Sequence, residues 1–425
     1  MSNVAKPATV VGSQFPAASP RASLKGLEIF ADPKTPHLAL LTAGRDKPYA
    51  LGLASALIAK NLCFEFIGSD IVNAPELHGN NQVTYLNLRD QQSNAGAFEK
   101  VRRVLVYYCR LLGYAATARP EIFHILWNNK FELFDRTLLM GYYKLLKKKV
   151  VITAHNVNAG ARDGNDSLLN RLSLRTQYSL SDHIFVHTER MKAELVSDFG
   201  VPKAKVTVIP FGINNTVPNT LLTAAEAKGR LGVRQGDKVL LFFGNIAPYK
   251  GLEYLVDAFS RLLEEDPSYL LIIAGRPKGS ELYWSQIERS IAESGIDRRV
   301  IKRIEYVPDE ETELYFKAAD LLILPYTHIF QSGVLFLSYS FGLPVIAADV
   351  GSLREEIVEG KTGLMFEARN YFHLASTIRA YFRNESQSDL ENRRAEITRY
   401  ANEKYSWDRI ITVAMAVYSD LLLHS

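Results

Sequence analysis

The strongest constraint on the fold is a repeated alternation of short apolar runs with segments of helical periodicity. Apolar runs such as HLALLTA (37–43) and CFEFIGSD (63–70) flank YALGLASALIAKN (49–61), which repeats apolar residues at helical spacing. Strands that alternate with helices form parallel sheets with crossover helices. The sequence therefore predicts the α/β class, with doubly wound parallel sheets.

The alternation runs twice along the chain. In the first series, further strands are expected at 121–128, 148–156, 183–189 and 205–212, and a helix at 167–182. In the second series, strands are expected at 238–245, 269–276, 300–307, 321–326 and 344–349. Between the two series, Pro, Gly and Asn interrupt the pattern at 210–220. This interruption predicts a domain boundary.

The length of 425 residues is enough for two separate hydrophobic cores. We predict a flexible N-terminal tail at 1–36, a Rossmann-like domain at 37–212 and a second Rossmann-like domain at 213–404. The final helix, at 405–425, has an apolar stripe near Trp407 that must pack on another element.

Charge and cysteine content exclude several classes of protein. A net charge of +4, from 50 basic and 46 acidic residues, argues against a nucleic-acid-binding protein. Two cysteines are too few for a disulfide framework or a zinc site and favour a reducing, cytoplasmic location. The longest apolar stretch, 333–351, is broken by Gly342 and Pro344, so we expect helix, turn and strand rather than a membrane span.

One basic patch, KLLKKK (144–149), is a candidate for peripheral contact with anionic lipid on the inner face of a membrane. The alternative is a solvated helix end before a buried strand.

The most informative strand end is GNIAPYKG (244–251). Open parallel sheets bind ligands at the carboxyl ends of their strands. Gly244 lets a ligand approach the backbone, Asn245 offers amide donors, and Lys250 stands at the start of the next helix. A cation beside a helix N-terminus favours an anion such as phosphate. The alternative is a solvent-exposed lysine at an ordinary helix start.

A second candidate is FQSGVLFLSYSFG (330–342). Ser332 is expected to cap a helix whose first N–H groups, at Gly333 and Val334, point outward. Alone, this pattern describes a capped helix without a ligand. Combined with Lys250 in the same domain, it favours phosphate binding.

Two further segments follow strands. In ADVGSLREEIVEGKTGLMF (348–366), Ser352 and Glu355 are expected to form a capping box, and the GKT triplet lacks the first glycine of a P-loop. In TAHN (153–156), His155 is either a structural histidine or part of the site. The first strand is followed by GRDKPYALG (44–52) rather than G-x-G-x-x-G, which disfavours a dinucleotide enzyme.

The blocks GNIAPYKGLEYLVDAF, VTVIPFGIN and FGLPVIAADVGSLREEIVEGKTGLMF resemble the retaining glycosyltransferases of family 4, which have the GT-B fold. The resemblance covers nearly all of the chain after the tail. It implies two Rossmann-like domains facing across a cleft, with a UDP- or GDP-type sugar donor bound by the second. It also implies a glycan or lipid-linked acceptor on the first domain, transfer with retention, no metal or other cofactor, and a role in polysaccharide or glycoconjugate biosynthesis.

The resemblance also implies roles for individual residues. Lys250 and His155 map to the catalytic positions, Lys250 at the donor diphosphate and His155 near the transferred sugar. Acceptor contacts are expected at Trp127, Asn128 and Asn156. Donor contacts are expected at Gly44, Gly244, Asn245, Lys250, Arg276, Tyr306, Val307, Gln331, Ser332, Gly333 and Val334.

The chain departs from the family pattern at three positions. Asn245 stands where the family usually has arginine, and Ile329 and Leu337 stand where it has two glutamates that serve ribose and sugar. His328 and Gln331 are the candidate substitutes. Two alternatives therefore stay open, namely a non-catalytic nucleotide-sugar or glycan-binding protein and a GT-B sugar-nucleotide enzyme such as an epimerase.

Overall fold

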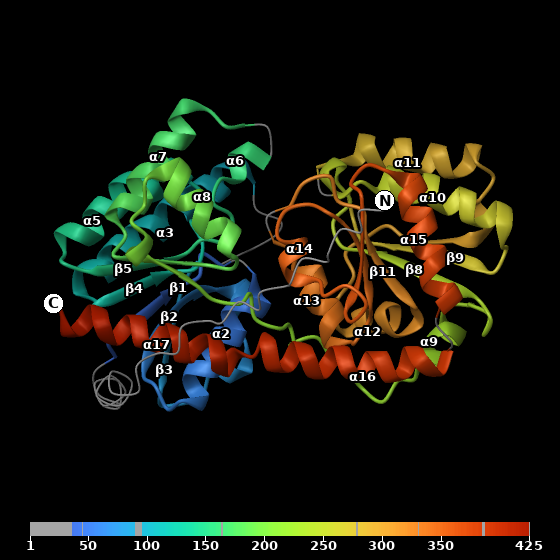
Figure 1. The fold of residues 1–425 in the computed structure, drawn as a ribbon. Helices are drawn as coiled ribbons and strands as arrows, with labels where there is room; N and C mark the ends of the chain where they lie inside the picture. Colours follow the sequence, from blue (N-terminus) through green and yellow to red (C-terminus); the bar gives the residue numbers. More distant parts are fainter. Residues whose placement is uncertain are drawn as a thin grey trace, which may run out of the picture.

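The computed structural model describes residues 36–424 except 45, 90–95, 163–164, 278, 330 and 385–386. The described residues form two parallel sheets, with strand orders β3-β2-β1-β4-β5-β6-β7 and β10-β9-β8-β11-β12-β13 (Figure 1). The predicted fold class, two doubly wound parallel-sheet units, is confirmed. The predicted tail at 1–36 lies outside the described residues except for its last position.

The first sheet has a helical layer on each face. Its strands are β1 (Leu38–Leu41), β2 (Phe64–Ser69), β3 (Val83–Arg89), β4 (Ile122–Ile125), β5 (Lys149–Thr153), β6 (His183–Val186) and β7 (Val206–Val208). Its helices are α2 (Lys47–Ala59), α3 (Ala97–Thr117), α4 (Glu132–Phe134), the π-helical turn η3 (Asp135–Leu139), α5 (Met140–Leu145), α6 (Ala159–Arg162), α7 (Leu168–Leu180) and α8 (Glu189–Phe199).

The alternating side chains of β1 show which helices cover which face of the sheet. Leu38 and Leu40 of β1 pack in one core cluster with α2, whereas Ala39 and Leu41 pack in another with α3 and α5. Successive side chains of a strand point to opposite faces, so α2 and α3 cover opposite faces of the sheet.

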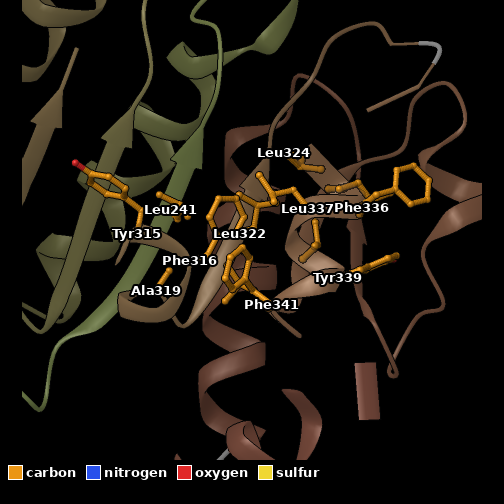
Figure 2. Close-up of a cluster of buried hydrophobic side chains, with 14 of the residues drawn as sticks. Leu241, Tyr315, Phe316, Ala319, Leu322, Leu324, Phe336, Leu337, Tyr339 and Phe341 are labelled. Atoms are coloured by element: carbon orange, nitrogen blue, oxygen red, sulfur yellow. The ribbon is translucent and has the colours of Figure 1, made fainter. Parts of the chain in front are cut away.

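The second sheet is built in the same way. Its strands are β8 (Lys238–Phe243), β9 (Tyr269–Ala274), β10 (Val300–Arg303), β11 (Leu321–Leu324), β12 (Val345–Ala348) and β13 (Gly363–Phe366). One face carries α10 (Leu252–Glu265), α11 (Glu281–Glu293) and α15 (Tyr371–Asn384), and the other carries α12 (Asp309–Ala318), α13 (Gly333–Ser340) and α16 (Gln387–Lys404). Figure 2 shows part of the second core, where side chains of α12 and α13 meet those of β8 and β11. The short helices α9 (Ala224–Arg230) and α14 (Leu353–Glu356) complete the set.

The chain crosses between the two sheets twice, and the two crossings are hydrogen-bonded to each other. After α16 the chain continues into α17 (Trp407–Leu423), so that these two helices run along one side of both units (Figure 1). Ile213, in the first crossing, donates its N–H to the carbonyl of Tyr405 at 3.0 Å. Trp407 returns a hydrogen bond from Nε1 to the carbonyl of Ile213 at 2.9 Å.

The Trp407 indole lies against two glycines, Gly52 of α2 and Gly212 at the start of the first crossing. A Cβ on Gly52, in α2, would lie 2.2 Å from the ring, and a Cβ on Gly212 would lie 2.5 Å from it. Gly212 also has a φ of +77°, a conformation that favours glycine. Beyond the indole, α17 packs on α2, and the Tyr418 hydroxyl lies 2.6 Å from Nδ1 of His124 in β4.

We predict that Gly52→Ala lowers the free energy of unfolding by about 1–3 kcal/mol, because the added methyl group overlaps a ring that cannot move aside. Denaturant unfolding measures this change. Gly113→Ala is the matched control, since Gly113 is also inside a helix and a Cβ there meets nothing within 4 Å. The control is expected to be neutral or stabilising. Equal stability of the two variants would contradict this packing.

Candidate functional site

The carboxyl ends of the two sheets face each other across a cavity of about 540 Å³. One wall consists of α7 and α8, and the other consists of the loops after β11 and β12. The two units also touch directly, because the N–H of Glu189 donates to Oε2 of Glu355 at 3.2 Å and Phe211 stacks on Phe336 at 5.0 Å. Neither Lys250 nor His155 lines this cavity, so the predicted catalytic residues lie beside it rather than in its wall.

Lys250 is a buried cation at the carboxyl end of β8. It ends a short turn, Pro248–Lys250, and only 6% of its surface is exposed. Its Nζ donates to the Tyr326 hydroxyl at 2.7 Å and lies 4.0 Å from the centre of that ring. The next residue, Gly251, has a φ of +63°, and a Cβ there would lie 2.0 Å from the carbonyl of Pro325. The alternative of a solvent-exposed lysine is therefore wrong.

Tyr326 links Lys250 to the start of α13. Its hydroxyl lies 3.3 Å from Oγ of Ser332, and burial raises the pKa of Tyr326 far above its usual range, so the hydroxyl keeps its proton. Ser332 precedes α13 but makes no capping hydrogen bond, so the predicted cap is wrong. Its Oγ lies against Tyr326 instead.

At Gly244, the end of β8 also approaches the first turn of α13. The φ of Gly244 is +100°, and a Cβ there would lie 3.3 Å from Cγ2 of Val334 in the first turn of α13. Gly333, the first residue of α13, is exposed. The structure thus brings Gly244, Lys250 and the first N–H groups of α13 to one edge of the sheet, as the sequence predicts.

The other residues predicted to bind the donor differ in their exposure. Arg276 lies over the exposed ring of Tyr306, with 5.4 Å from Cζ to the ring centre. Asn245 is exposed as well. The Val307 side chain, in contrast, is buried in the core, so it is a packing residue.

The segment after β12 does not form the predicted capping box. Oγ of Ser352 donates to Oε1 of Gln331 at 2.6 Å, and Glu355 accepts from Glu189 of the other unit. Ser352 has a helical φ of −80° and makes no capping hydrogen bond. The predicted capping box is therefore wrong, and both side chains serve contacts at the cavity.

The two positions where the family has glutamates are apolar and buried. Ile329 is 5% exposed and Leu337 is 7% exposed, and both belong to the core cluster around α13. Figure 2 shows Leu337 among the core side chains near Leu324. Neither position supplies a polar group to the cavity.

On the first sheet, His155 is buried among aromatic rings. It follows β5, is 8% exposed and stacks on Trp127 with ring centres 4.2 Å apart. Tyr49 meets it edge-on at 4.7 Å. Nδ1 of His155 lies 2.9 Å from Nε2 of His187. Burial, His187 and His124 hold the pKa of His155 well below its usual range, so the ring is neutral.

The remaining predicted site residues of the first unit lie in different surroundings. Asn128 exchanges two amide hydrogen bonds with Gln177 of α7, at 3.2 and 2.6 Å, so its side chain holds α7 in place. Asn156 is half-buried after β5. Gly44, after β1, has a φ of +66° and donates its N–H to Oγ1 of Thr42 at 3.2 Å.

The KLLKKK segment is partly used inside the fold. Lys144 forms an ion pair with Asp182 at 2.6 Å. Lys148 donates to the carbonyls of Ala118 and Pro120 at 2.7 and 2.8 Å. Two of its four lysines therefore serve as helix-end and strand-start contacts, while Lys147 is exposed.

Sequence reasoning missed two groups of residues at the site. One is His187, which follows β6 as His155 follows β5, so strand-end position alone could have identified it. The other is the cavity-facing side of α7, where Leu168, Arg171, Leu172 and Arg175 follow helical spacing. Among the described residues, no cluster of three or more His, Cys, Asp or Glu side chains is arranged to hold a metal ion.

The buried histidine pair generates a prediction about pH. Burial lowers the pKa of His187 from 6.5 to about 4. The unfolded chain therefore binds a proton that the folded chain excludes, and stability present above pH 6.5 is lost as the pH falls toward 4. The loss amounts to about 1.4 kcal/mol per pH unit for one such proton.

We expect His187→Gln to make the pH dependence of the unfolding free energy shallower by about one proton over this range. Denaturant titrations at a series of pH values measure the slope. The wild type, measured in the same buffers, is the reference. An unchanged slope in His187→Gln would show that His187 titrates normally.

Two protein-family models together match most of the chain. The family "Glycosyl transferases group 1" matches residues 224–404, and "Glycosyltransferase Family 4" matches residues 49–216. A D-inositol 3-phosphate glycosyltransferase from Corynebacterium efficiens is 26% identical over 64% of this chain and 65% of its own length. One from Geodermatophilus obscurus is 28% identical over 56% of this chain and 52% of its own length. The matches thus span less than two thirds of these relatives.

Solved structures share the fold. A sucrose-phosphate synthase from Thermosynechococcus elongatus has a TM-score of 0.73 at 18% identity, covering 92% of this chain and all of that one. Anabaena HepE in complex with UDP and glucose has a TM-score of 0.68 at 15% identity, with the same coverage. The two parallel-sheet units thus have the GT-B fold. With family matches on both of its sheets, the chain belongs to the group 1, family 4 glycosyltransferases.

Proposed function

We propose that this protein transfers a sugar from a UDP- or GDP-type nucleotide-sugar to a glycan or lipid-linked acceptor, with retention of anomeric configuration, in polysaccharide or glycoconjugate biosynthesis. The observation that carries the proposal is the buried Lys250, held by Tyr326 beside the first turn of α13. A buried ammonium next to exposed helix N–H groups is suited to a diphosphate.

The proposed donor site follows the edge of the second sheet. Lys250 and the N–H groups of Gly333 and Val334 contact the diphosphate, and the exposed Arg276 and Tyr306 lie toward the nucleobase. Support comes from HepE, which shares the fold and whose structure contains UDP and glucose. The positive charge at this edge comes from the protein itself, so the proposal includes no metal ion.

The proposed acceptor site is the cavity between the two units. Its α7 wall combines the exposed Leu168 and Leu172 with two arginines. Arg171 pairs with Asp166, whereas no ion pair of Arg175 occurs among the described residues. An apolar surface beside an arginine suits a lipid-linked or phosphorylated acceptor. The curated relatives, named D-inositol 3-phosphate glycosyltransferases, are consistent with this choice.

In the proposed reaction, the bond between the anomeric carbon and the diphosphate oxygen breaks, and the acceptor oxygen bonds to the same face of that carbon. The acceptor hydroxyl passes its proton to the departing phosphate oxygen. Lys250 and the α13 N–H groups stabilise the negative charge that develops on the diphosphate. His155 is held between the rings of Trp127 and Tyr49, and its role in this proposal is to position the sugar.

We predict that Lys250→Met reduces kcat/KM by an amount equivalent to about 2–4 kcal/mol, because one preorganised charge at the leaving group is lost. Methionine keeps the buried volume beside Tyr326. Initial rates with a panel of UDP- and GDP-sugars measure the effect. Lys302→Met is the control, since Lys302 pairs with Asp297 on the outside of β10 and should keep full activity.

Undiminished kcat/KM in Lys250→Met would contradict the assignment. Thermal shifts with nucleoside diphosphates distinguish the alternatives. A nucleotide at about 100 times its Kd should stabilise the wild type by about 2.7 kcal/mol. Binding without transfer to any acceptor would favour a non-catalytic binding protein, and a new sugar-nucleotide formed from donor alone would favour an epimerase.

We further propose that the first unit contacts anionic lipid through the outer faces of α3 and α5. Phe98, Val101 and Leu105 recur at helical spacing on α3 and are 83%, 58% and 56% exposed. Lys100 and Arg110 are exposed on the same helix. The two helices adjoin, because the Tyr142 hydroxyl in α5 donates to the carbonyl of Leu112 in α3 at 3.2 Å. An apolar stripe flanked by cations is typical of interfacial helices.

No helix within the described ranges is both long and apolar enough to cross a membrane.

We predict that the wild type sediments with phosphatidylglycerol vesicles and that the double variant Phe98→Ser, Leu105→Ser sediments several-fold less, because apolar insertion is lost. Leu282→Ser is the control, since Leu282 is 84% exposed on the second unit. Equal sedimentation of all three proteins would contradict the assigned surface.

A further inference from the structure

His187 is the inner member of a chain of hydrogen bonds that ends at His155. Nδ1 of His187 lies 3.2 Å from the carbonyl oxygen of Ile209. Nε2 of His187 lies 2.9 Å from Nδ1 of His155. Both rings are buried, with 3% and 8% of their surfaces exposed. These hydrogen bonds therefore link the backbone after β7, the side chain that follows β6 and the side chain of His155 after β5.

The first acceptor in this chain fixes the direction of every bond after it. A carbonyl oxygen can only accept, so Nδ1 of His187 carries its hydrogen. A neutral imidazole has one N–H, so Nε2 of His187 accepts. Nδ1 of His155 must then donate, which leaves Nε2 of His155 with a lone pair and no hydrogen. Burial keeps both rings neutral by lowering the pKa of each.

The lone pair on His155 is buried and has no hydrogen-bond partner among the residues that the structure describes. The rings around it hold its orientation, with Trp127 stacked at an interplanar angle of 4° and Tyr49 edge-on at 88°. Buried polar atoms in folded proteins are almost always hydrogen-bonded. An acceptor left without a partner in this way is suited to a hydrogen-bond donor from outside the protein.

We propose that His187 is a positioning residue that fixes the tautomer of His155, so that Nε2 of His155 accepts a hydrogen bond from a substrate hydroxyl. The inference rests on the proposed function, since the hydroxyl belongs to the donor sugar or to the acceptor. In this proposal, Nε2 of His155 accepts hydrogen bonds and cannot donate them. Phosphate oxygens, which only accept, are excluded as partners of Nε2.

The direct test is ¹⁵N NMR of histidine-labelled protein, in which unprotonated and protonated imidazole nitrogens have well-separated shifts. The chain has nine histidines, and single substitutions assign the His155 signals. The expected wild-type spectrum has His155 unprotonated at Nε2 and protonated at Nδ1. A proton on Nε2 in the wild type would overturn the proposal without any variant.

Variants test whether His187 sets this state. His187→Leu removes the acceptor for Nδ1–H, and the Nε2–H tautomer of His155 should appear. His187→Gln retains an oxygen that can accept from Nδ1–H, and should keep the wild-type pattern. His183→Gln is the matched control, because His183 begins β6, the strand that His187 follows, but bonds Thr207 at 2.9 Å. A wild-type pattern in His187→Leu would overturn the proposal.

Tyr49 packs edge-on against His155 and has a buried hydroxyl, so it is tested as a competitor for the lone pair. Tyr49→Phe should leave the Nε2 shift unchanged. A change would mean that Tyr49 occupies the lone pair in solution, which would overturn the substrate assignment.

Activity and ligand titration complete the test. His187→Leu should lower kcat/KM by about 10- to 100-fold, as for other partners that orient a functional histidine, and His187→Gln should recover most of it. The Nε2 shift should move on adding nucleotide-sugar if the hydroxyl is the donor's, and only on adding acceptor if it is the acceptor's. The NMR pattern does not depend on turnover, so an inactive protein with the expected tautomer would refute the proposed function alone.

Discussion

The arrangement of the two sheets depends on how Trp407 is held where the chain crosses between them. Its indole fills the space left by the missing side chains of Gly52 and Gly212, and its N–H is bonded to the carbonyl of Ile213. These contacts tie α2, the first crossing and the start of α17 together. The carboxyl ends of both sheets can therefore form one cavity only while this crossing is intact.

From that crossing, an aromatic layer extends to both halves of the site. Tyr49 packs on Trp407 at 5.1 Å and on His155 at 4.7 Å, and Phe211 stacks on Phe336 at the far side. Rings of this kind are rigid and packed without gaps, so a movement of one unit is transmitted to the other. A movement of one unit against the other would therefore shift His155 and the start of α13 together.

The fold was largely predictable, because alternating strand and helix patterns leave few parallel topologies. β3 and α3 were missed. β3 is a half-exposed edge strand, so it lacks the continuous apolar run of a buried strand. The apolar residues of α3 do recur at helical spacing, so this helix could have been found from the sequence. At the site, Lys250, Gly244 and the start of α13 were predictable from strand-end position. Ser332, Ser352 and Asn128 were not, because their partners Tyr326, Gln331 and Gln177 come from other loops or helices and only tertiary structure brings them close.

The central claim is that a donor diphosphate binds between Lys250 and the first turn of α13. The most direct measurement is a crystal structure of the protein with the nucleoside diphosphate that stabilises it most. The account predicts diphosphate oxygens within hydrogen-bond distance of Nζ of Lys250 and of the N–H groups of Gly333 and Val334. A diphosphate bound elsewhere, with Lys250 still closed on Tyr326, would contradict it.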